Sequence, residues 1–158
     1  MNFLEQLVAE WYEINGYFVR RNVRVGKLAH GGHEGELDVV AFHPEQKRLV
    51  HIESSMDGDT WDRREERFIR KFRVGRDQIS KVFEGFGPLP EPEQIALFVF
   101  GSAKDHLTIG GGKVRMIADL MAEIREYLAT HHGHVATAAI PEQYVILRAL
   151  QFAANYWK

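Results

Sequence analysis

Two short apolar segments joined by five residues constrain the fold more than any other feature of the chain. Residues 36–42 (ELDVVAF) and 48–55 (RLVHIESS) each have the length and composition of a strand, and the linking HPEQK contains Pro44. A connection this short permits only antiparallel pairing, because parallel strands need a crossover of a dozen residues or more. We therefore expect a sheet that contains this hairpin.

The rest of the chain predicts helices and two further strands around it. Residues 95–100 (IALFVF) form a wholly apolar run, which is typical of a strand buried on both faces. The other expected elements are a helix over 3–14 ended by Asn15-Gly16, a strand over 17–25 with Tyr17, Val19, Val23 and Val25 on one face, a helix over 61–86 bent near Gly75, and helices over 114–129 and 141–156.

This order of elements predicts an α/β fold, in which the first three strands form a meander and the fourth joins after a helical crossover. A length of 158 residues suits one domain. We expect a single domain over 1–158, with its core over 1–105 and a C-terminal helical extension over 106–158. The run IGGGKVRM lacks the spacing of a phosphate-binding loop, so we interpret it as a tight turn into the next helix.

Composition excludes several classes of protein. The chain has no cysteine, so disulfides and thiolate metal sites are excluded. Acidic residues interrupt the apolar pattern of the first helix, unlike a signal peptide, and no segment approaches the length of a membrane span. We expect a cytoplasmic protein that does not enter membranes.

The charge is unevenly distributed. The net charge is −2, yet residues 61–81 carry eight basic and four acidic side chains. Such a stripe either guides a nucleic acid to one face or forms a solvated helix laced with ion pairs.

Asp38 and Glu53 are the candidate chemical groups. Alternation along the two hairpin strands lets both point to the same face, each among apolar residues. Two adjacent carboxylates resist burial as ions, and a bound Mg²⁺ or Mn²⁺ removes the conflict. The alternative is that Glu53 caps the strand end while Asp38 pairs with Arg20 or Arg24.

GELDVVAF followed by RLVHIESS resembles the PD-(D/E)XK nuclease superfamily, in particular its archaeal Holliday-junction-resolvase-like and small bacterial endonuclease members. FLEQLVAEWYEINGYFVRRNVR is similar to the leading helix and basic strand of that family. The resemblance implies a restriction-endonuclease-like three-layer core with a mixed central sheet (α-β-β-β-α-β), followed by C-terminal helices.

The same resemblance implies a set of site residues. Asp38, Glu53 and the backbone carbonyl of Ser54 would ligate the metal, Glu5 would be the helix glutamate, and Gln78 a glutamine of the following helix. Phosphate contacts to DNA would come from the basic stripe, namely Arg63, Arg64, Arg67, Arg70 and Lys71.

One position departs from the family. Ser55 stands where the family has a lysine, so the missing charge has three possible explanations. A cation comes from the following helix, with Arg70, Lys71 and Lys81 as candidates; or the metal alone supports slow cleavage; or catalysis is lost. His51 shares the strand face of Glu53 and is either a supporting group or an ordinary strand histidine.

We therefore expect a metal-dependent DNA endonuclease acting in repair or recombination. The competing expectation is an inactive module of nuclease ancestry that binds DNA or a protein. The sequence leaves the oligomeric state undecided, and a homodimer formed through the C-terminal helices is one alternative.

Overall fold

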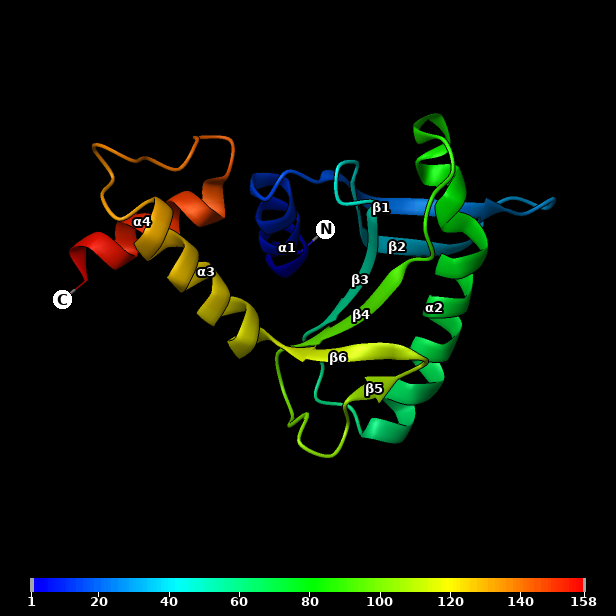
Figure 1. The fold of residues 1–158 in the computed structure, drawn as a ribbon. Helices are drawn as coiled ribbons and strands as arrows, with labels where there is room; N and C mark the ends of the chain where they lie inside the picture. Colours follow the sequence, from blue (N-terminus) through cyan, green and yellow to red (C-terminus); the bar gives the residue numbers. More distant parts are fainter. Residues whose placement is uncertain (1, 158) are drawn as a thin grey trace.

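A six-stranded mixed sheet lies at the centre of the computed structural model, which describes residues 2–157 (Figure 1). In the sheet the strands follow the order β1-β2-β3-β4-β6-β5. The strands are β1 Phe18–Lys27, β2 His33–His43, β3 Arg48–Ser55, β4 Glu93–Phe98, β5 Thr108–Ile109 and β6 Gly112–Met116. The helices are α1 Phe3–Ile14, α2 Trp61–Val82, the short 3₁₀ helix Glu84–Phe86, α3 Ile117–His131 and α4 Val145–Tyr156.

The topology confirms a mixed α/β fold. Strands β1, β2 and β3 pair antiparallel as a meander, and β4 pairs parallel to β3 after the α2 crossover. Helices cover both faces of the sheet: α1, α3 and α4 pack on one, and α2 on the other (Figure 1). Within residues 2–157, no helix is long and apolar enough to cross a membrane.

Glu10 fastens the C-terminal helices to α1. Its buried carboxylate accepts hydrogen bonds of 2.9 Å from the backbone nitrogens of Ile146 and Leu147, in the first turn of α4. These N–H groups have no partner inside their own helix, and a carboxylate is favoured at the positive end of the helix dipole. The acidic residue that interrupts the apolar face of α1 is thus an anchor for α4.

Strand β1 does not keep one apolar face along its length. Val19 packs against the cluster of α1, whereas Val23 and Val25 belong to the cluster of α2. Between them Asn22 has a φ of 50°, in the left-handed region. This conformation reverses the side of the sheet to which the following side chains of β1 point. The prediction that Tyr17, Val19, Val23 and Val25 share a face was therefore wrong.

Strand β2 makes the same change at the facing position. Leu37 packs on the α2 side, but Val39 and Ala41 pack on the α1 side. The change falls at Asp38, which faces Asn22 in the register that pairs Arg21 with Val39. One of the two predicted metal ligands therefore lies where the β1–β2 ribbon switches faces.

The segment after residue 106 contributes strands as well as helices. Gly110 and Gly111 have φ values of 54° and 84°, as in a type I′ turn, and connect β5 to β6. The expected tight turn is present, but it leads into a strand. Residues 112–116 were predicted in part as helix; pairing with β4 makes them β6, and α3 begins at Ile117.

Candidate functional site

The structure brings Asp38 and Glu53 together at the end of the β2–β3 ladder. The last regular pair is Val39 with Ile52. Beyond it, backbone N–H groups donate to the two carboxylates and no longer to backbone carbonyls of the opposite strand. Asp38 N donates to Glu53 Oε1 at 3.3 Å, and Ser54 N donates to Asp38 Oδ2 at 3.0 Å. Both residues are buried. Each carboxylate is thus held by the backbone of the other strand.

The alternative partners of Asp38 are not used. Arg24 forms an exposed ion pair with Glu36 at 3.5 Å. The cation beside Asp38 comes instead from α2: Lys71 Nζ lies 3.6 Å from Asp38 Oδ1 and hydrogen-bonds to Glu53 Oε2. The following helix therefore supplies a positive charge to the carboxylate pair, and Lys71, expected among the phosphate contacts of the basic stripe, is engaged with this pair.

This environment sets the charges of the three groups differently. Burial, followed by the neighbouring Glu53 carboxylate, raises the pKa of Asp38 to about 7, against the opposing effect of Lys71. Burial acts in the same direction on Glu53, but His51 and Lys71 overcome it and lower the pKa of Glu53. Burial disfavours the Lys71 ammonium, yet the two carboxylates raise the pKa of Lys71. At neutral pH, Glu53 and Lys71 are charged and Asp38 is near its titration point.

A chain of hydrogen bonds fixes Glu53 from the other side. Arg76 Nη1 donates to Gln94 Oε1 at 2.7 Å, so the Gln94 amide nitrogen faces Phe72 O at 2.9 Å and His51 Nδ1 at 3.1 Å. Because Nδ1 accepts that bond, the ring proton lies on Nε2, 2.8 Å from Glu53 Oε1. His51 is therefore a supporting group with a defined tautomer.

Gly75 makes room for this arrangement. A Cβ at this position would lie 2.4 Å from two ring atoms of His51 and 3.1 Å from Gln94 Nε2. Glycine is unfavourable inside a helix, so the close approach of the imidazole explains its presence in α2. Helix α2 continues through Gly75 as one helix from Trp61 to Val82.

Ser55 shares the face of Glu53 but belongs to a second polar cluster. Its hydroxyl donates to Asp57, whose carboxylate also meets Arg67 Nη2 at 2.5 Å. Arg67 Nη1 reaches Asp59 at 2.9 Å. Partial burial opposes ionisation, but the hydrogen bond from Ser55 and the nearby arginines lower the pKa of Asp57 to about 2. Asp57 and Asp59 are thus arginine partners as well as turn residues.

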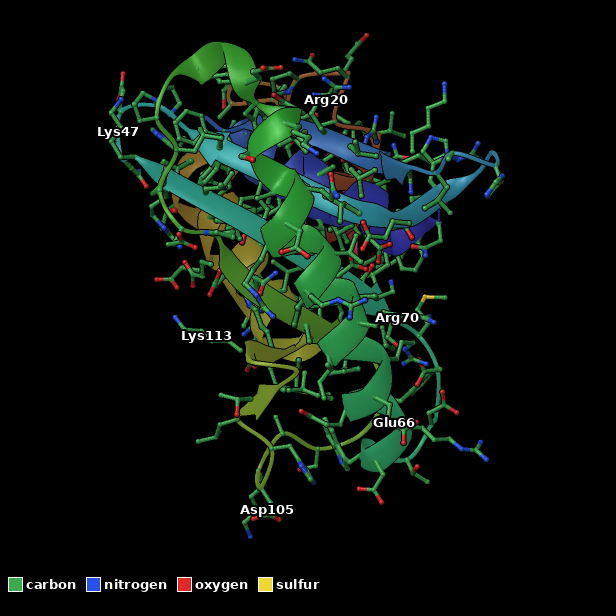
Figure 2. All side chains as sticks on the ribbon, turned by 90° about the vertical axis from the view of Figure 1, so that its right-hand side faces the viewer. Arg20, Lys47, Glu66, Arg70, Asp105 and Lys113 are labelled. Atoms are coloured by element: carbon green, nitrogen blue, oxygen red, sulfur yellow. The ribbon has the colours of Figure 1, made fainter. Side chains whose placement is uncertain are left out.

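The structure divides the basic stripe. Arg64 is only 2% exposed; it bonds the carbonyls of Asp57 and Phe100 and lies over the rings of Trp61 and Phe98. Its prediction as a phosphate contact was wrong, because the guanidinium is enclosed by these groups. The residues of the predicted set that stay exposed are Arg63 and Arg70, the latter labelled beside α2 in Figure 2.

Glu5 and Gln78 lie in different surroundings. The Glu5 carboxylate closes a capping box with Asn2 and accepts a 2.9 Å hydrogen bond from Asn22, the residue facing Asp38. Gln78 bonds Glu34 at 3.2 Å and Lys81 at 2.9 Å, two helical turns beyond Lys71. Glu5 is thereby linked to the strand position beside Asp38, whereas the structure does not bring Gln78 to the carboxylate pair.

The donors at this site suit a hard cation. Among the residues that the structure covers, no group of three or more His, Cys, Asp or Glu side chains could hold a metal ion. The ligands expected from the sequence, the carboxylates of Asp38 and Glu53 and the backbone carbonyl of Ser54, are all oxygen atoms, the kind of ligand that Mg²⁺ and Mn²⁺ prefer.

Sequence reasoning missed Gln94, Arg76 and Gly75. Gln94 and Arg76 belong to no motif, because a glutamine in a strand and an arginine in a basic helix are ordinary residues at such positions. An isolated glycine inside a long helical pattern was the available signal, since it often marks a close packing contact.

Comparisons with known proteins do not assign the chain to a family. No family model and no curated protein match the chain. One solved structure that is similar is described as the crystal structure of a protein of unknown function, AF1548. It shares 13% identity and a TM-score of 0.47, with 99% of this chain and 98% of that chain covered. A likeness at this level carries no argument about the activity.

Proposed function

We propose that the protein is a metal-dependent endonuclease that hydrolyses phosphodiester bonds in DNA and has a restriction-endonuclease-like core. The observation that carries the proposal is the group formed by Asp38, Glu53 and Lys71. Lys71 supplies, from helix α2, the positive charge that the PD-(D/E)XK motif places where this chain has Ser55. The order α1, three antiparallel strands, α2 and a parallel β4 is in keeping with that core.

The chain's own residues have distinct parts in this chemistry. Asp38, Glu53 and the Ser54 carbonyl would hold the cation, which when bound polarises a phosphoryl oxygen and activates water. The Lys71 ammonium can stabilise negative charge that develops on the phosphate. His51 keeps Glu53 ionised and oriented through its Nε2–H.

Contacts with DNA would be fewer than the basic stripe predicts. Arg64 and Arg67 are bound to Asp57, which leaves Arg63 and Arg70 as exposed phosphate contacts from α2. Each phosphate contact contributes a slope of about 0.9 to the dependence of log affinity on log salt. Replacing both arginines with glutamine should therefore reduce that slope by about 2 and weaken binding to all sequences alike.

Nicking of supercoiled plasmid in Mg²⁺ or Mn²⁺ tests the proposal. We expect cleavage by the wild type, none by Asp38→Asn, and a loss of about 10²–10³ in rate for Lys71→Met. Lys104→Met, which removes an exposed loop lysine, is the matched control and should cleave normally.

A second substitution separates the role of Lys71 from a folding defect. Ser55→Lys in the Lys71→Met background returns an amine to the motif position and should recover part of the lost rate. Equal nicking by the wild type and Asp38→Asn would refute the nuclease proposal. Salt-dependent DNA binding by the wild type without any metal-dependent nicking would instead identify a non-catalytic module.

A further inference from the structure

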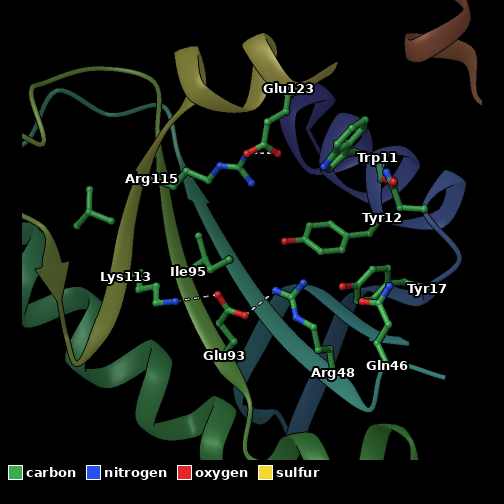
Figure 3. Close-up of a pocket in the computed structure, with 12 residues that line it drawn as sticks. Trp11, Tyr12, Tyr17, Gln46, Arg48, Glu93, Ile95, Lys113, Arg115 and Glu123 are labelled. Carbon is green, nitrogen blue, oxygen red and sulfur yellow. Dashed lines mark hydrogen bonds and ion pairs between the residues drawn. The ribbon is translucent and has the colours of Figure 1, made fainter. Parts of the chain in front are cut away.

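A cavity of about 450 Å³ opens on the face of the sheet opposite α2, and it contains none of the residues of the carboxylate site. Its walls come from α1, the start of β3 and β4, β6, and Glu123 of α3 (Figure 3). Its volume lies within the range of about 300–1,000 Å³ that is usual for small-molecule sites.

The cavity has more positive than negative charge. Glu93 is shared by two cations, with Arg48 Nη2 at 2.7 Å and Lys113 Nζ at 3.1 Å. Glu123 Oε2 lies 2.6 Å from Arg115 Nη2. Three cations therefore face two carboxylates, and one positive charge remains for a ligand.

Arg115 and Tyr12 are the two donors in this cavity that bear on what it could bind. Arg115 Nη2 is buried in an ion pair of 2.6 Å with Glu123, although the angles of that contact are not those of a hydrogen bond. Tyr12 is only 9% exposed, and its hydroxyl points into the cavity without a hydrogen-bond partner in the described chain (Figure 3). Burial raises the pKa of Tyr12 to about 12, so the hydroxyl keeps its proton and acts as a donor. A tyrosine hydroxyl without a partner, beside a cavity with one positive charge in excess, favours an anionic acceptor there.

The remaining wall is aromatic. Trp11 and Tyr17 line the cavity beside Tyr12, and Tyr17 packs edge-on against Tyr12 with ring centroids 5.0 Å apart. Such rings favour a flat apolar group, whereas the guanidinium fork of Arg115 matches the planar geometry of a carboxylate.

From these features we propose that the cavity binds a small aromatic carboxylate, with its carboxylate on Arg115 and Tyr12 and its ring against Trp11 and Tyr17. A single carboxylate balances the excess charge, whereas a phosphate monoester would exceed it. The proposal does not depend on nuclease activity, because the two sites share no residue.

Indole-3-acetate and its neutral amide, indole-3-acetamide, are matched probes. Calorimetric titration of the full chain should give saturable binding of the acid with a Kd of about 1 mM or tighter, and no measurable binding of the amide. Tyr12→Phe keeps the ring and removes only the hydroxyl; it should weaken binding about tenfold, as should Arg115→Met. Arg125→Met, at an exposed arginine of α3 outside the cavity, should bind like the wild type.

Thermal unfolding of each variant shows whether it is folded, and Tyr12→Phe decides the outcome if Arg115→Met is not. The proposal is overturned if the acid does not bind, if acid and amide bind equally, or if Tyr12→Phe binds like the wild type. Tighter binding of adenosine 5′-monophosphate than of indole-3-acetate would overturn the carboxylate assignment in favour of a phosphate site.

Discussion

Replacing Asp38 with asparagine should change how the stability of the protein depends on pH. The pKa of Asp38 rises from 3.8 to about 7 on folding, which corresponds to about 4 kcal/mol at about 1.4 kcal/mol per unit. The side chain is only 12% exposed, so solvent screens this effect little. Because the folded pKa is the higher one, the contribution of Asp38 to stability is complete below pH 3.8 and is lost as the pH rises through 7.

Asparagine keeps the shape of the side chain and does not titrate. The free energy of unfolding of the wild type, minus that of Asp38→Asn, should therefore fall by about 4 kcal/mol between pH 4 and pH 8. With a urea m value of about 2 kcal/mol/M, the relative midpoint moves by about 2 M. Groups present in both proteins, such as Glu53 and Lys71, largely cancel in this difference.

Urea unfolding at half-unit pH steps is the assay. Glu36→Gln replaces a carboxylate on the same strand whose side chain is 45% exposed, and its difference from the wild type should stay nearly flat with pH. Parallel stability curves for the wild type and Asp38→Asn would refute the reasoning, because they would mean that Asp38 has the same proton affinity folded and unfolded.

Three further outcomes are expected. Mg²⁺ at 100 times its Kd should stabilise the wild type at pH 8 by about 2.7 kcal/mol and leave Asp38→Asn unchanged, and equal shifts in thermal unfolding would rule out this site. Gly75→Ala should lose about 1–3 kcal/mol in urea unfolding, because the new Cβ meets the His51 ring at 2.4 Å; Gly85→Ala, with nothing within 4 Å, is its control. Arg64→Met should lose about 2–3 kcal/mol, because the carbonyls of Asp57 and Phe100 lose this donor and the Asp57 carboxylate loses one of its two arginines. The exposed Arg63→Met should stay within about 0.5 kcal/mol.

The sequence alone determined most of the secondary structure and the pairing of the hairpin. Helix α1 and strand β3 begin and end where predicted, because apolar periodicity and turn residues are local properties that the chain carries with it. The short connection between β2 and β3 required antiparallel pairing, and side-chain alternation then brought Asp38 and Glu53 to the same place.

Tertiary structure decided what local pattern cannot. Residues 112–116 became a strand because β4 offered an open edge, and the left-handed Asn22 reversed the faces of β1 without any apolar signal. Sequence named Lys71 among three candidate cations, but only the position of α2 over the sheet places its ammonium between the two carboxylates.

The same is true of the roles of buried polar residues. Arg64 and Arg70 are the same residue type in the same basic helix. Arg64 is nevertheless enclosed by carbonyls and aromatic rings, whereas Arg70 is exposed. Gln94 joins Arg76 to His51 across elements that are far apart in the chain. Hydrogen bonds and ion pairs of this kind depend on distances between elements, and those distances are set by packing, which only the folded structure shows.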